Sequence, residues 1–97
     1  MRNVRFRTKR IKITNHAKRR MSERNITESL VITVIRNPED VLYDTDTGRE
    51  VLIDYNHGIA IICEELTDIV IVVTVVFSKN LKKLVERRIS SGRWVKC

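Results

Sequence analysis

Three side chains that could act together on a phosphate group lie four residues apart near the start of the chain. On a helix, His16, Arg20 and Arg24 would stand one above another, bordered by Arg19 and Glu23. An imidazole titrates near neutrality, whereas guanidinium groups hold phosphate oxygens through charge-assisted hydrogen bonds. Metal-independent RNA cleavage needs this combination: a base for the 2′-hydroxyl proton and cations for the charge that develops on the phosphate.

The same row also has a purely structural interpretation. A histidine in a first helical turn can bond neighbouring backbone, and the arginines can bridge to carboxylates such as Glu28 or Asp54. Spacing alone does not decide, because polar rows at this spacing are common on helices. The second histidine, His57, falls in a tight turn, so we expect it to be exposed and not catalytic.

Two consecutive helices are predicted to carry and support the row. Thr14 or Asn15 can cap a helix over residues 16–24. Thr27 can cap a second helix, which Pro38 ends. The buried stripe of this second helix comprises Leu30, Val31, Val34 and Ile35.

Strands are predicted before and after these helices. Alternating apolar residues at Val4, Phe6, Ile11 and Ile13 indicate an edge strand or hairpin arm. Beyond the second helix, runs at 41–43, 51–55, 59–63 and 69–77 are separated by turn residues and predict a meander. The last run is nearly continuous in β-branched residues, which favours a central strand buried on both faces.

A final amphipathic helix is predicted at about residues 78–92. Its apolar stripe faces a row of cations, which we expect to bind nucleic acid together with Arg19: Lys79, Lys82, Lys83, Arg87 and Arg88. The elements together predict an α+β domain over residues 1–97, in which two N-terminal helices pack on a four- to five-stranded antiparallel meander sheet.

The formal net charge of +7 is unevenly distributed. Residues 1–24 hold ten basic residues and one acidic residue. Residues 25–68 hold two basic and ten acidic residues, and residues 69–97 hold seven basic residues and one acidic residue. Two basic ends could form one positive face for a polyanion, or they could be neutralised by the acidic middle. Composition alone leaves both arrangements open.

Other function classes are disfavoured by the sequence. The longest apolar run, 69–77, is far below the roughly 20 residues that span a bilayer. We therefore expect a cytoplasmic protein with no membrane partner. Cys63 and Cys97 have no spacing typical of a disulfide framework or zinc site, and no metal or other cofactor is predicted.

The run Thr14-x-His16-Ala17-x-x-Arg20-Met21-x-Glu23-Arg24-x-Ile26 resembles the T-x-H-A-x-x-R-M-x-x-R-x-I signature of a widespread uncharacterised prokaryotic domain family. The resemblance covers about residues 11–77. That family looks related to the RelE-like and barnase-like small ribonuclease fold, which includes toxins of toxin–antitoxin pairs. By position, His16, Arg20 and Arg24 match the signature. Thr74 matches a threonine that such domains place beneath the helix pair, and Asn25 stands where a glycine is usual.

Three functional hypotheses follow. The leading one is a metal-independent endoribonuclease, with His16 as general acid or base, Arg20 and Arg24 holding the scissile phosphate, and Glu23 and Thr74 in support. The second is a non-catalytic nucleic-acid-binding or regulatory protein in which His16 is structural. The third is a protein-partner module whose charged faces meet an antitoxin or a second copy of the chain.

Overall fold

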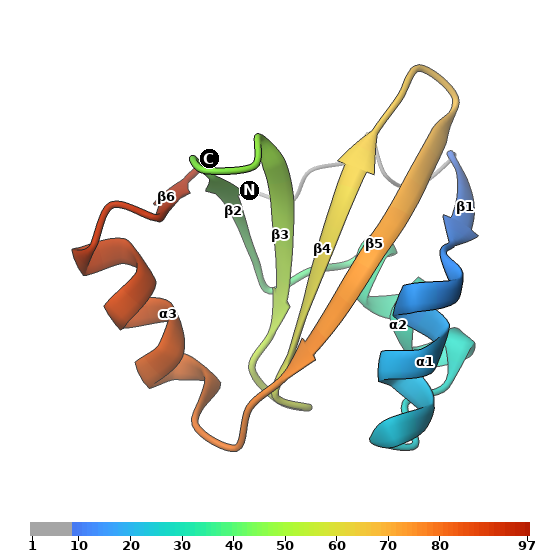
Figure 1. Cartoon of the computed structure of the whole chain (residues 1–97), viewed down its shortest axis with the longest axis horizontal. Coiled ribbons are helices and arrows are strands. Elements are labelled where there is room, and N and C mark those ends of the chain that lie inside the picture. The colour runs from blue at the N-terminus through green and yellow to red at the C-terminus, as the bar shows by residue number, and fades with distance from the viewer. Residues whose placement is uncertain (1–8) are drawn as a thin grey trace.

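A six-stranded mixed sheet organises the computed structural model, which describes residues 9–97 (Figure 1). The described elements are, in order, β1 (Arg10–Ile13), α1 (Asn15–Glu23), α2 (Glu28–Arg36), β2 (Asp40–Asp44), β3 (Arg49–Asp54), β4 (Ile59–Glu65), β5 (Ile69–Phe77), α3 (Leu81–Ser90) and β6 (Trp94–Lys96). The strand order is β1-β5-β4-β3-β2-β6. The α+β class and the β2-to-β5 meander are therefore confirmed.

The sheet differs from the predicted antiparallel one at both edges. β1 pairs in parallel with β5, from Arg10 opposite Ile69 to Ile13 opposite Val72. Alternation sets which face a residue occupies and carries no information on strand direction, so the sequence could not predict this pairing. β6 pairs antiparallel with β2 and was not predicted, because three residues after a helix end carry almost no periodic signal. The predicted contributions of Val4 and Phe6 fall outside the described residues.

Helices cover both faces of the sheet, as Figure 1 shows with α1 and α2 on one side and α3 on the other. The first core lies between α1, α2 and one face, and includes Ala17, Met21, Val31 and Ile35. The second lies between α3, β6 and the opposite face, and includes Leu81, Val85 and Trp94. Strands β3 and β4 lie between the two cores and are almost fully buried.

Strand β5 is interior, as predicted, but it is not buried on both faces. Val70, Val72 and Val75 contribute to the core under α1 and α2, whereas Ile71 and Val73 are only partly buried. The second core is built mainly on β2, β3 and β4. The side chains on the other face of β5 are therefore less buried. A register shift opposite Ile62 and Cys63 interrupts the pairing of β4 with β5.

The Thr27 N-cap is confirmed, and of the two candidates at the start of α1 it is Thr14 that caps the helix and fixes it on the sheet. The Thr14 hydroxyl accepts from the Ala17 amide at 3.1 Å, and the Thr27 hydroxyl accepts from the Leu30 amide at 3.1 Å. Thr14 also donates its hydroxyl proton to the Val73 carbonyl oxygen at 3.0 Å. The start of α1 is thus tied directly to β5. Within residues 9–97, no helix has the length and apolar character needed to cross a membrane.

Candidate functional site

The predicted row on α1 lies on the solvent side of the helix. His16, Arg20 and Arg24 are all exposed, while Ala17 and Met21 on the same helix are buried in the core. No hydrogen bond engages the His16 ring among residues 9–97. The imidazole is therefore accessible to a ligand rather than bonded into the structure.

The two arginines of the row have different surroundings. Arg20 lies 3.7 Å from the Glu23 carboxylate in an exposed i, i+3 pair, which solvent screens strongly. Arg24 follows the end of α1 as its C-cap, and its guanidinium carbon lies 4.9 Å from the centroid of the Phe77 ring. This cation–π contact holds Arg24 against the end of β5.

The row extends over two helical turns, and its last arginine lies against an aromatic ring of β5. At a rise of about 1.5 Å per residue, the Cα atoms of His16 and Arg20 are about 6 Å apart, and those of His16 and Arg24 about 12 Å. His16 and Arg20 can act on the same group. Arg24, whose guanidinium group lies against the Phe77 ring, is placed to bind a neighbouring phosphate group.

The backbone turns left-handed just after α1, at the position where the resembled signature usually has a glycine. Asn25 has φ 55°, the conformation for which glycine is usual, and asparagine is among the few other residues that tolerate it.

The cations of α3 do not join the α1 row. Arg19 lies exposed on α1, whereas all five predicted α3 cations lie on exposed positions across the sheet: Lys79, Lys82, Lys83, Arg87 and Arg88. Figure 1 shows the sheet between the two helices. One cleft lined by α1 and α3 together is therefore ruled out for the described residues.

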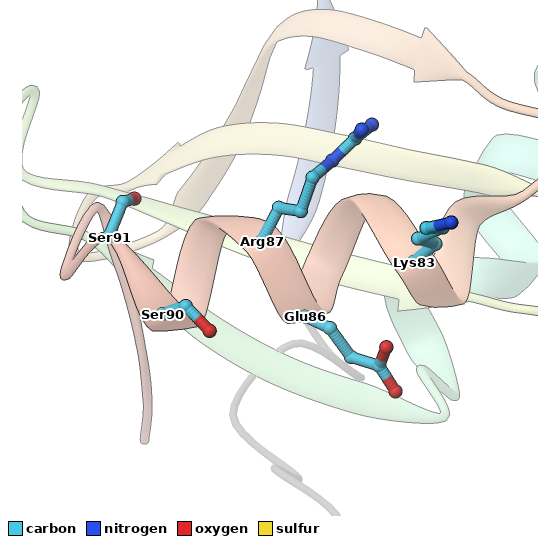
Figure 2. A pocket seen from close by; sticks show the side chains of 5 residues that line it. All are labelled: Lys83, Glu86, Arg87, Ser90 and Ser91. Atoms are coloured by element: carbon cyan, nitrogen blue, oxygen red, sulfur yellow. The ribbon is translucent and has the colours of Figure 1, made fainter.

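A shallow hollow of about 530 Å³ runs along α3, but it has mixed charge. Figure 2 shows Lys83, Glu86, Arg87, Ser90 and Ser91 lining it, with Glu86 and Arg87 extending to opposite sides of the helix. A carboxylate within this hollow weakens its attraction for a polyanion.

Thr74 does not lie beneath the helix pair. It pairs with Ile62 on β4, a member of the core under α3, and it lines a hollow with Arg88 and Arg93. The register shift in β5 puts Val72 and Val75 toward α1 and α2, and leaves Thr74 on the other face. The expected support of α1 by Thr74 is therefore wrong.

A buried carboxylate beside this hollow was missed by sequence reasoning. Asp44 Oδ1 accepts from Arg93 Nε at 3.0 Å and from the backbone amides of Asp46 and Thr47 at 2.9 and 3.1 Å. Its Oδ2 accepts from the Trp94 indole nitrogen at 3.2 Å. Burial alone would raise the pKa of Asp44, but these hydrogen bonds outweigh it and hold the pKa at about 2.

A second missed feature is a histidine–carboxylate pair at the β3–β4 turn. His57 Nδ1 lies 2.7 Å from Asp54 Oδ2, and the His57 backbone amide also donates to Asp54 at 3.2 Å. Burial would raise the pKa of Asp54, but the His57 hydrogen bond and the nearby Glu39 lower it overall. The i, i+3 spacing of Asp54 and His57 was the only signal for this pair, and His57 is exposed as predicted.

Residues 9–97 contain no group of three or more histidine, cysteine or acidic side chains arranged to hold a metal ion. Cys63 is buried, and Cys97 is exposed and free.

Residues 13–77 match the family model described as "Domain of unknown function (DUF4258)", and the chain belongs to that family. The matched segment runs from the end of β1 to the end of β5, so it contains the α1 row. Neither a curated protein nor a solved structure matches the chain.

Proposed function

We propose that this DUF4258 member is an RNA-directed protein that cleaves RNA without a metal ion, in the manner expected of a RelE-like ribonuclease. The observation that carries the proposal is the exposed His16 ring, which forms no hydrogen bond within residues 9–97 and shares a helix face with Arg20. A structural histidine would be expected to bond the protein around it.

In this proposal His16 takes the proton of a ribose 2′-hydroxyl as general base. The 2′-oxygen then attacks the adjacent phosphorus, the bond from phosphorus to the 5′-oxygen breaks, and the leaving oxygen gains a proton from His16 or water. The products are a 2′,3′-cyclic phosphate and a free 5′-hydroxyl. Arg20, one helical turn away, stabilises the charge that builds on the phosphate oxygens.

The remaining predicted site residues take supporting roles. Arg24, held over Phe77, binds the neighbouring phosphate, and Arg19 binds the flanking backbone. Glu23 orients Arg20 through their 3.7 Å ion pair. The cations of α3, across the sheet, form a separate backbone-binding surface that contributes affinity and not chemistry.

The test is cleavage of a single-stranded RNA by purified protein in the presence of EDTA. We expect products with cyclic-phosphate ends and a loss of about 10²-fold or more in His16→Ala, the range found for general acid–base groups. His57→Ala removes the other histidine, which lies on the β3–β4 turn, and should cleave like the parent. Full-rate cleavage by His16→Ala contradicts the proposal.

The second candidate is RNA-backbone binding without cleavage. It is favoured by one observation: in the part of the chain that the structure describes, no carboxylate is hydrogen-bonded to the His16 ring, whereas Asp54 is hydrogen-bonded to His57. This function predicts intact RNA and an affinity that falls steeply with salt. Substituting Arg20 or an α3 lysine should then weaken binding to similar extents across RNA sequences.

A further inference from the structure

A small hollow lies on the α3 side of the sheet, away from His16. It has a volume of about 240 Å³ and lies where β3, β4 and β5 meet the end of α3 and the start of β6. Three arginines line it, together with one acidic residue, two threonines and three apolar residues: Arg49, Arg88, Arg93, Asp44, Thr47, Thr74, Ile62, Val76 and Trp94.

Arg49, which lines this hollow, has a side-chain donor without a hydrogen bond. Its Nε atom is buried and has no hydrogen-bond partner among the described residues. The nearest paired carboxylate oxygen, on Glu64, lies 3.8 Å away, beyond hydrogen-bonding distance. A buried donor without a partner is uncommon in native proteins and calls for a bound water, an ion or a ligand.

The other two guanidinium groups are held by packing that leaves donors available. Arg93 donates through Nε to Asp44 at 3.0 Å, and its Nη2 lies 3.7 Å from the exposed Asp46 carboxylate. The Arg88 guanidinium carbon lies 5.7 Å from the centroid of the Trp94 ring, and Arg88 forms no ion pair within residues 9–97. Both side chains are thus positioned before any ligand arrives.

Asp44 does not oppose an anion as strongly as an isolated carboxylate would. Both of its oxygens already accept hydrogen bonds, from Arg93, Trp94 and two backbone amides. Its role is to fix Arg93 and the Trp94 ring, which in turn carries Arg88. The lining residues therefore include three cations and one carboxylate, whose oxygens are already hydrogen-bonded, so the hollow has a net positive charge.

We propose that this hollow is a binding site for a phosphate group, held by Arg49, Arg88 and Arg93. Guanidinium forks match the geometry of phosphate oxygens, and the Thr74 hydroxyl offers a further donor beside them. The volume is smaller than the roughly 300 to 1,000 Å³ of sites that enclose drug-sized molecules. The site therefore takes a phosphate group and leaves any attached nucleoside outside.

This site goes beyond the proposed RNA cleavage and does not depend on it. It lies on the opposite face of the sheet from His16 and uses none of the α1 residues. His16→Ala should therefore leave phosphate binding unchanged, so failure of one proposal is distinguishable from failure of the other.

The experiment is a titration with inorganic phosphate at constant ionic strength, read by the fluorescence of the chain's one tryptophan and by the NMR signals of the Trp94 indole and Arg49 Nε protons. We expect saturable binding in the millimolar range or tighter. Arg49→Gln and Arg88→Gln should each weaken it by about tenfold, as expected for loss of a charge-assisted hydrogen bond.

Arg10→Gln is the matched control, because it makes the same charge change at an exposed residue of β1 that does not line the hollow. Glu64→Gln should tighten phosphate binding severalfold, since it removes the carboxylate that competes for Arg49. Three results would overturn the proposal: no saturable binding, an Arg10→Gln effect equal to that of Arg88→Gln, or no gain in affinity in Glu64→Gln.

Two further ligands distinguish the source of the phosphate group. A dinucleoside monophosphate presents a phosphodiester, and a 5′-phosphorylated dinucleotide presents a terminal phosphate. Binding of the diester, shifting the same two NMR signals, assigns the site to a nucleic-acid backbone. Binding restricted to inorganic or terminal phosphate assigns it to a phosphate monoester or free phosphate.

Discussion

Asp44 is expected to make the fold sensitive to acid, and its replacement should remove the part of that sensitivity that this carboxylate contributes. Its side chain is only 6% exposed, and four donors satisfy it. Those donors hold its pKa at about 2, against 3.8 for an unperturbed aspartate. Because folding lowers the pKa, the folded protein binds protons less readily than the unfolded chain does, and acid favours unfolding.

The size of the effect follows from the pKa. At about 1.4 kcal/mol per factor of ten in acidity, lowering the pKa from 3.8 to about 2 contributes between about 2 and 3 kcal/mol to the free energy of unfolding. This contribution is complete above about pH 5 and is lost as the pH falls through 3.8 toward 2. At neutral pH, Asp44→Asn should cost a similar amount or more, because one amide proton would face the Trp94 indole donor.

Urea unfolding from pH 7 to pH 2, followed by circular dichroism, measures this directly. The difference in unfolding free energy between the parent and Asp44→Asn should shrink as the pH falls, by about 2 kcal/mol between pH 6 and pH 2. Asp46→Asn is the control: its side chain is 72% exposed, and it should change stability by no more than about 0.5 kcal/mol. A parent-to-Asp44→Asn difference that is constant over this range would refute the account of the buried carboxylate.

Three further predictions concern backbone conformation and thiol access. Asn25→Ala should cost about 1 kcal/mol of stability, whereas Asn25→Gly should cost nothing measurable by thermal unfolding, because φ at this position is 55°. Gly58→Ala should cost at least about 3 kcal/mol, because a Cβ there would lie 2.6 Å from a carbonyl oxygen at φ +69°. Gly92→Ala, with nothing within 4 Å, should cost only about 1 kcal/mol. Alkylation of the native protein followed by mass spectrometry should modify Cys97 alone, and modification of Cys63 without denaturant would contradict its burial.

Local signals predicted most of the secondary structure. Thr14 and Thr27 both cap the helices expected of them, since an N-cap depends on only a few neighbouring residues. The strands of the meander were predicted because apolar runs in the sequence are separated by turn residues. Strand direction at β1 and the existence of β6 depend on contacts with residues far along the chain, and local patterns do not encode them.

The candidate site was predictable only where it lies on one element. The α1 row is read directly from helical spacing, and its exposure follows from the apolar positions of Ala17 and Met21. The phosphate hollow joins Arg49, Thr74 and Arg88 from three elements, and the register shift in β5 decides which face Thr74 occupies. A register shift moves side chains to the opposite face, so no one-dimensional pattern could have assembled these residues.

The arrangement of ion pairs decides which of the chain's positive charges remain available. Acidic residues of the middle segment pair with cations at both ends of the described chain: Lys9 with Glu65 at 2.7 Å, Arg10 with Asp68 at 3.6 Å, Arg93 with Asp44 at 3.0 Å and Lys96 with Asp40 at 3.9 Å. These cations lie in or beside the outer strands β1 and β6, next to the strands and turns that carry the acids. Within residues 9–97, no cation of α1 or α3 pairs with the acidic middle segment, and the two helices lie on opposite sides of the sheet. The exposed cations of α1 and of α3 therefore form two separate surfaces, and a polyanion should meet them as two separate sites.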